Sequence, residues 1–395
     1  MPVSSARLPS RGEFQLDPGL VFLNHGSFGA VPIEVERAAT ALRAEMERNP
    51  VEWLGRRSDE LLSAARTRLG AFLGAPPDDV VFFPNPTTAV NMVVRSLRLE
   101  EGDEVLTTDH EYGACDATWR WVCERTGAVY RRVEIPLPFA ASEFASRLLA
   151  AVTPRTKLMF LSHITSTTAL IFPIRDICEA ARSRGILTLI DGAHAPGQID
   201  LHLEALGADF YTGNGHKWMC GPKGSAFLYA RPEHHALLQA PVVSWGYVAE
   251  GLGGHSGFDA YTGSGTLQRR LQWQGTRDLS AWLALPAAIE FQQRHNGSAV
   301  RTRCRAQALG ALHTLRARWG LDAIARDSDL GQMVAIPVPH QDAEALRRRL
   351  FQENRIEVPV TQHAGQTFVR ISVPCYTTQT EIEALMNAPV WADRP

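Results

Sequence analysis

The stretch that decides the fold, residues 185–227, reads GILTLIDGAHAPGQIDLHLEALGADFYTGNGHKWMCGPKGSAF. Its pattern predicts an apolar strand, 186–190, that ends at Asp191, then a short helical crossover, a second strand, 208–212, and a polar turn carrying Lys217. Two parallel strands joined by a crossover bring their carboxyl ends to one edge of a sheet, where ligands bind in open α/β folds. We therefore expect Asp191 and Lys217 to face the same crevice.

Asp191 and Lys217 are the kind of pair that suits pyridoxal phosphate. A carboxylate beside the ring nitrogen of this cofactor keeps the nitrogen protonated, and a lysine can hold its aldehyde as a Schiff base. Each residue also has an ordinary interpretation, because strand-end aspartates often form turns and loop lysines are usually solvated. Lys217, however, lies between His216 and Trp218 in a glycine-rich segment of low charge. This setting favours the Schiff-base hypothesis.

The composition is that of a globular enzyme with more than one domain. The chain has 395 residues, 45% of them hydrophobic and 21% charged, which suggests two domains or one large domain with an appendage. The net charge of -2 gives no basic footprint for nucleic acid. No apolar run has membrane-spanning length and the start has no apolar signal segment, so we expect no membrane contact and a cytoplasmic location.

The cysteines of the sequence indicate neither a metal site nor a disulfide scaffold. No two of them have metal-ligand spacing, and they are too scattered for a disulfide framework. We predict that all six are buried thiols: Cys115, Cys123, Cys178, Cys220, Cys304 and Cys375.

Strand and helix patterns alternate from residue 80 onward, which predicts an α/β fold with a mostly parallel central sheet. The expected strands are 80–83, 104–107, 128–135, 157–163, 186–190, 208–212 and 225–229. We assign residues 51–275 to this large cofactor-binding domain, residues 1–50 to an N-terminal arm that joins the small domain, and residues 276–395 to a C-terminal small α+β domain. The glycine-rich stretch 244–270 is expected to be a functional loop.

The segment Asn85-Pro86-Thr87-Thr88-Ala89 is a candidate phosphate site. It follows a predicted strand and opens a predicted helix, so its free amide groups and hydroxyls can bind an anion. Taken alone, Thr87 or Thr88 is better explained as a helix cap. Beside the aspartate and lysine described above, we predict a contact with the cofactor phosphate. His216 is expected to add a contact to the phosphate or to the Schiff base.

Further candidates follow other strand ends. Tyr112 and His110 are both candidates for an aromatic ring that stacks on the cofactor, and the alternative is a half-buried loop tyrosine. His194, three residues after the aspartate, is expected to touch the ring. Arg370 interrupts an apolar strand, where a guanidinium can clamp a substrate carboxylate with two parallel hydrogen bonds. A solvated edge-strand arginine is the ordinary alternative.

Seven stretches of the chain together resemble the class V aminotransferase-like family of fold type I pyridoxal-phosphate enzymes, and within it the isopenicillin N epimerase-like branch. They are FLNHGSFGAVP (22–32), NPTTAVN (85–91), HEYGA (110–114) followed by Trp119, LIDGAHAPGQ (189–198), DFYTGNGHKW (209–218), WQGTRD (273–278) and FVRISVPCYTTQTEIEAL (368–385). The resemblance spans nearly the whole chain. It implies a large domain with a mostly parallel sheet that binds the cofactor, a smaller α+β domain, and a role in amino-acid metabolism.

The resemblance implies cofactor contacts that agree with those expected from the residues. Lys217 would hold the cofactor covalently, and Asp191 would contact the ring nitrogen. Tyr112 would be the stacking ring, where relatives carry a histidine or another aromatic. Thr88 and His216 would contact the phosphate.

Other roles are implied by the resemblance alone. Gly275 and Thr276 would reach the cofactor phosphate of a neighbouring subunit, so that a homodimer shares its active sites. Arg370 would bind the α-carboxylate of a small amino-acid substrate. Asn24 and His25 lie where the family's N-terminal arm approaches the substrate.

The sequence departs from one group of relatives in an informative way. Cysteine desulfurases carry a nucleophilic cysteine on a loop shortly before the carboxylate-binding arginine, whereas residues 361–366 here read TQHAGQ. Cys375 lies beyond the arginine. A persulfide mechanism is therefore disfavoured.

Several reactions remain open at the level of the sequence. Removal of the α-proton can lead to epimerisation, to elimination with carbon–sulfur cleavage, or to transamination, and we rank them in that order. In a different class, Asp191, His194 and His216 could ligate a metal in a hydrolase, but this leaves Lys217 and the phosphate segment unused. A protein that binds the cofactor without turnover is a further alternative.

Overall fold

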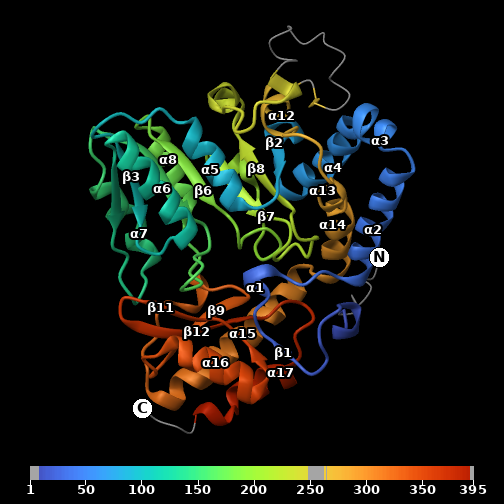
Figure 1. Ribbon diagram of the computed structural model, residues 1–395. Coiled ribbons are helices and arrows are strands. Elements are labelled where there is room, and N and C mark those ends of the chain that lie inside the picture. Colours follow the sequence, from blue (N-terminus) through green and yellow to red (C-terminus); the bar gives the residue numbers. More distant parts are fainter. Residues whose placement is uncertain (1–8, 248–261, 264, 392–395) are drawn as a thin grey trace, which may run out of the picture.

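The computed structural model describes residues 9–247, 262–263 and 265–391, which form two lobes (Figure 1). The large lobe is built on a seven-stranded sheet with the strand order β2-β8-β7-β6-β5-β3-β4. Its strands are β2 (Val80–Phe83), β3 (Glu104–Thr108), β4 (Val129–Val133), β5 (Thr156–Ser162), β6 (Leu187–Asp191), β7 (Phe210–Asn214) and β8 (Ala226–Ala230). Among them β8 alone runs antiparallel to its neighbours, so the predicted mostly parallel α/β sheet is confirmed.

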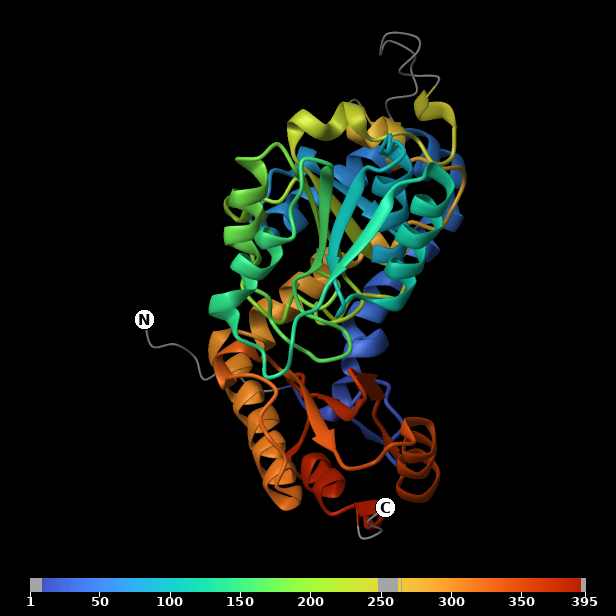
Figure 2. The same ribbon diagram turned by 90° about the vertical axis from the view of Figure 1, so that its left-hand side faces the viewer.

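Helices cover both faces of this sheet (Figure 2). They are α5 (Pro86–Ser96), α6 (Gly113–Thr126), α7 (Ala141–Ala150), α8 (Ile174–Arg182) and α9 (Leu203–Leu206). Successive side chains of a strand point to opposite faces, and Phe82 and Phe83 accordingly enter two different apolar cores. The sheet is thereby packed between two buried apolar cores, and the carboxyl ends of its parallel strands point toward the small lobe.

A group of helices flanks the sheet on the side of β2. It comprises α2 (Ile33–Arg48), α3 (Pro50–Arg56), α4 (Ser58–Leu73), α12 (Thr266–Leu271), α13 (Ser280–Leu283) and α14 (Leu285–His295). The helix α4 ends before Gly74, which adopts the left-handed conformation that glycine favours. Asn49 separates α2 from α3: its side chain accepts the amide of Glu52, and Pro50 is the first residue of α3.

The small lobe contains a three-stranded antiparallel sheet with the order β11-β12-β9. Its elements are α15 (Ser298–Trp319), β9 (Met333–Val338), α16 (Ala343–Asn354), β10 (Ile356–Glu357), β11 (Val360–His363), β12 (Gln366–Ser372) and α17 (Gln379–Met386). The strand β1 (Val21–Phe22) pairs in parallel with β10, and the short helix α1 (His25–Phe28) follows it. The N-terminal segment therefore runs from the small lobe into the large one.

The three-part division of the chain stays a prediction. Residues 21–22 lie in the small lobe, as expected for an arm, but α2 packs against α13 and α14 beside the large sheet. Most of the expected functional loop, at 248–261 and 264, lies outside the described residues. No helix in the described ranges combines the length and apolar composition needed to cross a membrane.

Candidate active site

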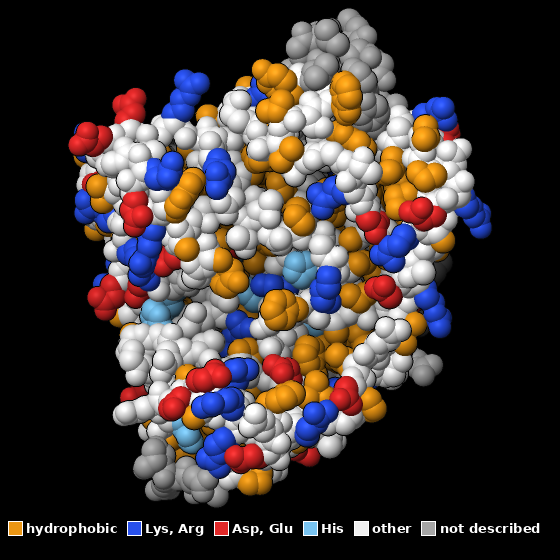
Figure 3. Space-filling model, viewed as in Figure 1, with side chains coloured by type: hydrophobic (Ala, Val, Ile, Leu, Met, Phe, Trp, Pro, Cys, Tyr) orange, Lys and Arg blue, Asp and Glu red, His pale blue; other side chains and the backbone are white. Residues whose placement is uncertain are grey.

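A cavity lies at the carboxyl ends of the parallel strands, where the surface is hollowed between the lobes and histidine and basic side chains gather (Figure 3). The sheet, the N-terminus of α5 and the α1 segment all contribute to its wall. Its lining residues are Ser27, Phe28, Asn85, Pro86, Thr87, Tyr112, Ser162, Ile164, Ser166, Asp191, Ala193, His194, Asn214, His216 and Lys217. Asp191 and Lys217 therefore line one cavity, as the strand pattern predicts.

Asp191 is the last residue of β6, and its side chain is 4% exposed. Its Oδ1 atom accepts the backbone amide of Ala193 at 2.9 Å, and the thiol of Cys115 lies 3.7 Å from Oδ2. Burial raises the pKa of the Asp191 carboxyl, although the Ala193 amide and the Lys217 charge oppose the shift. A cation beside this carboxylate would relieve the cost of its burial.

Lys217 lies in the turn after β7, and its amine lies 3.3 Å from the Nε2 atom of His194. Desolvation in the cavity lowers the pKa of the Lys217 amine to about 8, against the attraction of Asp191. The positive charge of Arg370 acts in the same direction as desolvation. At neutral pH this amine is deprotonated far more often than an ordinary lysine, and so is a better nucleophile and base.

The two histidines that line the cavity are both neutral. Burial holds the pKa of His194 well below its usual range, and lowers the pKa of His216 to about 4. The Nδ1 atom of His216 donates to the Ser225 carbonyl at 3.1 Å, because a carbonyl oxygen only accepts. The Nδ1 atom of His194 is buried and has no protein partner.

The amino end of α5 opens onto the cavity. Asn85 is its cap, and its Oδ1 atom accepts both the amide (2.9 Å) and the hydroxyl (3.0 Å) of Thr88. Neither threonine therefore caps the helix through its own side chain. Thr87 lines the cavity, whereas the Thr88 hydroxyl is turned toward Asn85. The free end of the helix favours an anion here.

Tyr112 and His110 are separated by the structure. Tyr112 lines the cavity at the start of α6 and is 46% exposed. His110 is buried away from the cavity, where its Nε2 atom donates to the Ile135 carbonyl and its Nδ1 atom contacts the Thr168 hydroxyl, both at 2.8 Å. Of the two candidates, Tyr112 has the geometry for a contact with a ring in the cavity.

Arg370 lies in β12 behind the wall of the cavity. Its guanidinium donates to the backbone and hydroxyl oxygens of Ser166, and to the hydroxyl of Ser27 at 3.1 Å. Both serines line the cavity. Burial lowers the pKa of Arg370 only to about 10, so the side chain is a cation at neutral pH. Its Nε atom is buried without a partner.

Besides Thr88 and Arg370, four more predicted residues lie outside this cavity. Asn24 donates from Nδ2 to Glu357 at 3.2 Å, and His25 contacts the backbone carbonyl of Lys217. Thr276 lines a separate apolar surface groove, and Gly275 precedes it with a φ of 107°. The predicted contact of Gly275 and Thr276 with a neighbouring subunit stays a prediction.

Several residues of the site were missed by sequence reasoning. Ser162 and Asn214 end β5 and β7, so the strand-end rule that found Asp191 applies to them as well. Ser27 and Ser166 come from irregular segments, where no periodic pattern predicts a direction for a side chain. The sequence suggests Thr87 or Thr88 as a possible helix cap, whereas the structure gives this role to Asn85.

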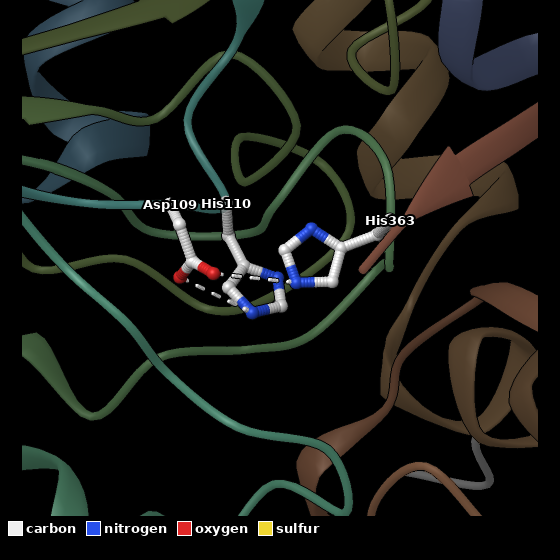
Figure 4. A group of neighbouring side chains, drawn as sticks. All are labelled: Asp109, His110 and His363. Carbon is white, nitrogen blue, oxygen red and sulfur yellow. Dashed lines mark ion pairs between the residues drawn. The ribbon is translucent and has the colours of Figure 1, made fainter. Parts of the chain in front are cut away.

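The structure does not favour a metal site. Among the described residues, the one group that could hold an ion is Asp109, His110 and His363, which lie side by side (Figure 4). A carbonyl oxygen accepts from His110 Nε2, so this nitrogen carries a proton and is not a ligand. The alternative cluster of Asp191, His194 and His216 does not form such a group.

The cavity fits pyridoxal phosphate. A buried carboxylate, an amine with a lowered pKa and a helix amino end match the ring nitrogen, the aldehyde and the phosphate of the cofactor. The buried Nδ1 of His194 and Oδ1 of Asn214, both without protein partners, lie on cavity-lining residues and can bond to polar atoms of a ligand.

Comparison with known proteins agrees with this fit. The family model Aminotransferase class-V matches residues 31–385. The isopenicillin N epimerase of Streptomyces clavuligerus is 41% identical over 384 residues, which cover 96% of each chain. The isopenicillin N epimerase of Amycolatopsis lactamdurans is 39% identical over 393 residues, with 98% of each chain covered. A probable chloroplastic L-cysteine desulfhydrase of Arabidopsis thaliana is 28% identical, covering 98% of this chain and 85% of that protein.

The fold is shared with solved structures. A C-DES mutant with glycine covalently linked to its pyridoxal phosphate cofactor superimposes with a TM-score of 0.83 at 23% identity, covering 98% of this chain and all of that one. The Escherichia coli cysteine desulfurase CsdA has a TM-score of 0.75 at 22% identity, with 96% of each chain covered.

The fold and the family match place this chain in the aminotransferase class-V family, with the fold type I architecture. Within that family the chain is a pyridoxal-phosphate-dependent enzyme, as the resemblance implied.

Proposed function

We propose that this protein epimerises the α-carbon of an amino-acid-containing substrate, as the names of its 41% and 39% identical relatives indicate for those proteins. The observation that carries the proposal is this identity along nearly the whole of both chains. The cavity supplies the two groups that α-proton chemistry needs, an amine with a lowered pKa and a buried carboxylate.

Five residues are proposed to hold the cofactor. Lys217 would bind its aldehyde, Asp191 would keep its ring nitrogen protonated, and Tyr112 would cover the ring. Thr87, with the amino end of α5, and His216 would contact the phosphate. When bound, pyridoxal phosphate supplies an electron sink that stabilises negative charge at the substrate α-carbon.

The predicted contact of Thr88 with the cofactor phosphate stays a prediction. Its hydroxyl bonds to Asn85, so its backbone amide and hydroxyl shape the end of the helix rather than line the cavity. An anion at this end would attract the remaining free amides of the first turn.

The substrate carboxylate is proposed to bind at Ser27 and Ser166, with Arg370 behind them. The guanidinium is a buried cation whose donors already reach both cavity-lining serines, so a carboxylate there meets hydroxyl donors and a positive charge. Asn24 would act further out, on the arm segment.

The proton step is proposed to use Lys217. A pKa of about 8 leaves part of this amine neutral at pH 7, and the neutral form accepts a proton from the α-carbon. Neutral His194 can accept a hydrogen bond from the resulting ammonium. Epimerisation requires that a proton return to the opposite face of the same carbon.

This function is tested with isopenicillin N in deuterated water. The proposal predicts inversion at one α-amino carbon together with uptake of one solvent deuteron, and no release of pyruvate. Recovery of the starting isomer without exchange would contradict it. Asp209→Asn, which removes a buried carboxylate remote from the cavity, serves as a folded control.

Carbon–sulfur cleavage is the second candidate. The desulfhydrase relatives are less similar, but C-DES, named a cystine C–S lyase, shares the fold at high TM-score. Pyruvate from cystine or S-substituted cysteines, without a D-product, would establish it. A persulfide route has no support, since the turn between β11 and β12 carries no cysteine and all six cysteines are buried. Transamination ranks third.

We also propose a cytoplasmic homodimer in which Gly275 and Thr276 approach the neighbouring active site. The groove lined by Thr276 supports this, because it also contains the exposed side chains of Val51 and Trp245. Sedimentation of the purified protein tests the dimer.

A further inference from the structure

The imidazole of His25 joins three segments that are distant in the sequence. Its Nε2 atom lies 3.0 Å from the backbone carbonyl of Lys217, and its Nδ1 atom lies 2.8 Å from the hydroxyl of Tyr376. The ring is completely buried and does not line the cavity. We propose that His25 is a positioning residue that fixes the backbone of Lys217 and thereby places its amine. This proposal rests on the proposed role of Lys217.

The hydrogen bonds determine the tautomer of His25. The Lys217 carbonyl only accepts, so Nε2 carries the proton and donates to it. The Nδ1 atom then accepts, as its contact with the amide of Ala30 at 3.2 Å requires. Burial lowers the pKa of His25 to about 3, so the ring stays neutral and this arrangement holds across the physiological range.

The chain directly after α1 also lies close to this backbone, at His216. Gly29 has a φ of 71°, and a Cβ atom at this residue would lie 1.9 Å from the carbonyl oxygen of His216. Only glycine fits both the backbone conformation and the space. Two adjacent peptide units, at His216 and Lys217, are thus contacted by one short segment of the N-terminal chain.

This contact is additional to the local turn. The Lys217 carbonyl also accepts the amide of Cys220 at 2.9 Å, so the turn keeps its own hydrogen bond when His25 is changed. His25 instead ties the turn to the N-terminal segment and, through Tyr376, to the chain that follows β12 in the small lobe. The ordinary alternative is a core histidine that contributes only to stability.

The two alternatives are separated by a matched pair of amides. In His25→Gln the side-chain amide can reach the former Nε2 position and donate to Lys217, whereas in His25→Asn the shorter side chain cannot. Phe14→Leu is the control for the surrounding core, because Phe14 packs on Tyr376 with ring centroids 4.3 Å apart and its side chain has no hydrogen-bonding group. Each apo-protein is mixed with pyridoxal phosphate, and the rate of covalent attachment is followed by absorbance together with the melting temperature.

We expect His25→Asn to slow attachment roughly fivefold or more and to lower kcat with little change in KM, since one buried hydrogen bond is lost. His25→Gln is expected to stay near the wild-type rate, and Phe14→Leu to lose melting temperature alone. Equal rates for His25→Asn and wild type would overturn the inference, as would equal defects in the two amide variants.

Two further outcomes are decisive. If His25→Asn does not fold, Tyr376→Phe is used instead. It removes the hydroxyl contact to Nδ1, so that the amide of Ala30 is left to hold this side of the ring. We expect slower attachment because the ring that orients the Lys217 carbonyl is then held less firmly, and an unchanged attachment rate overturns the inference. If the wild-type protein itself does not attach the cofactor at Lys217, the proposed function fails before this inference is reached.

Discussion

The amine of Lys217 lies 3.3 Å from the Nε2 atom of His194, whose other ring nitrogen is buried without a protein partner. Because burial and the nearby lysine keep His194 neutral, it can accept a hydrogen bond from the protonated amine without adding a charge. The same surroundings lower the pKa of the amine. The site thus prepares one lysine to act as both nucleophile and base.

The lowered pKa of Lys217 predicts the pH dependence of cofactor attachment. Only the neutral amine reacts with an aldehyde, so the attachment rate should rise with pH and reach half its maximum near pH 8. An ordinary lysine, with a pKa of 10.5, gives a curve displaced to higher pH. Stopped-flow absorbance measures the profile, and a midpoint above pH 10 would contradict the prediction.

Asp191→Asn should remove the anion that favours a protonated ring nitrogen. We expect kcat to fall about 100-fold to 1000-fold while the folded structure is retained, because charge stabilisation of this kind is a large part of catalysis. Asp209→Asn is the matched control, since Asp209 is also a buried carboxylate but bonds to Thr188 and His234. An equal fall of kcat in the two variants would contradict the prediction and indicate a general effect on folding.

Arg370→Lys should weaken substrate binding. Lysine keeps the charge but donates from a single nitrogen, which cannot occupy both positions from which Nη1 and Nη2 reach Ser166 and Ser27. We therefore expect KM to rise roughly tenfold to 100-fold. Arg347→Lys, at an exposed ion pair with Glu344, should leave KM unchanged. The prediction is wrong if kcat alone falls.

Glu111→Gln should change the pH dependence of stability. Burial raises the pKa of the Glu111 carboxyl from 4.5 to about 8, with the negative charge of nearby Asp191 acting in the same direction. Between these values the folded chain keeps a proton that the unfolded chain releases, so the wild-type protein loses stability as the pH rises.

The Glu111→Gln variant does not lose stability in this way, because glutamine does not titrate. Its stability relative to wild type should therefore increase between pH 5 and pH 8, by at most about 1.4 kcal/mol per pH unit. Urea unfolding of the apo-proteins across this range measures the difference in free energy of unfolding. A difference that does not change with pH would contradict the raised pKa of Glu111.

The sequence predicts the part of the site that depends on strand ends. Asp191 ends β6, and Lys217 and Tyr112 follow β7 and β3 of the same sheet. Because these strands run parallel, their carboxyl ends bring the three residues together. The apolar runs that form the strands are equally clear in the sequence.

The remainder depends on tertiary contacts that leave no periodic signal. His25 was expected at the substrate, yet its ring is turned to the backbone of Lys217, and only the packed structure shows this. The serines that join Arg370 to the cavity lie in irregular segments, where no periodic pattern predicts the direction of a side chain.

The most direct test of the account is chemical labelling. The protein is incubated with pyridoxal phosphate, reduced with borohydride, digested and analysed by mass spectrometry. The account predicts one stable label, on Lys217, and its loss in Lys217→Ala. A label on Lys223 or on another lysine, with Lys217 unmodified, would contradict it.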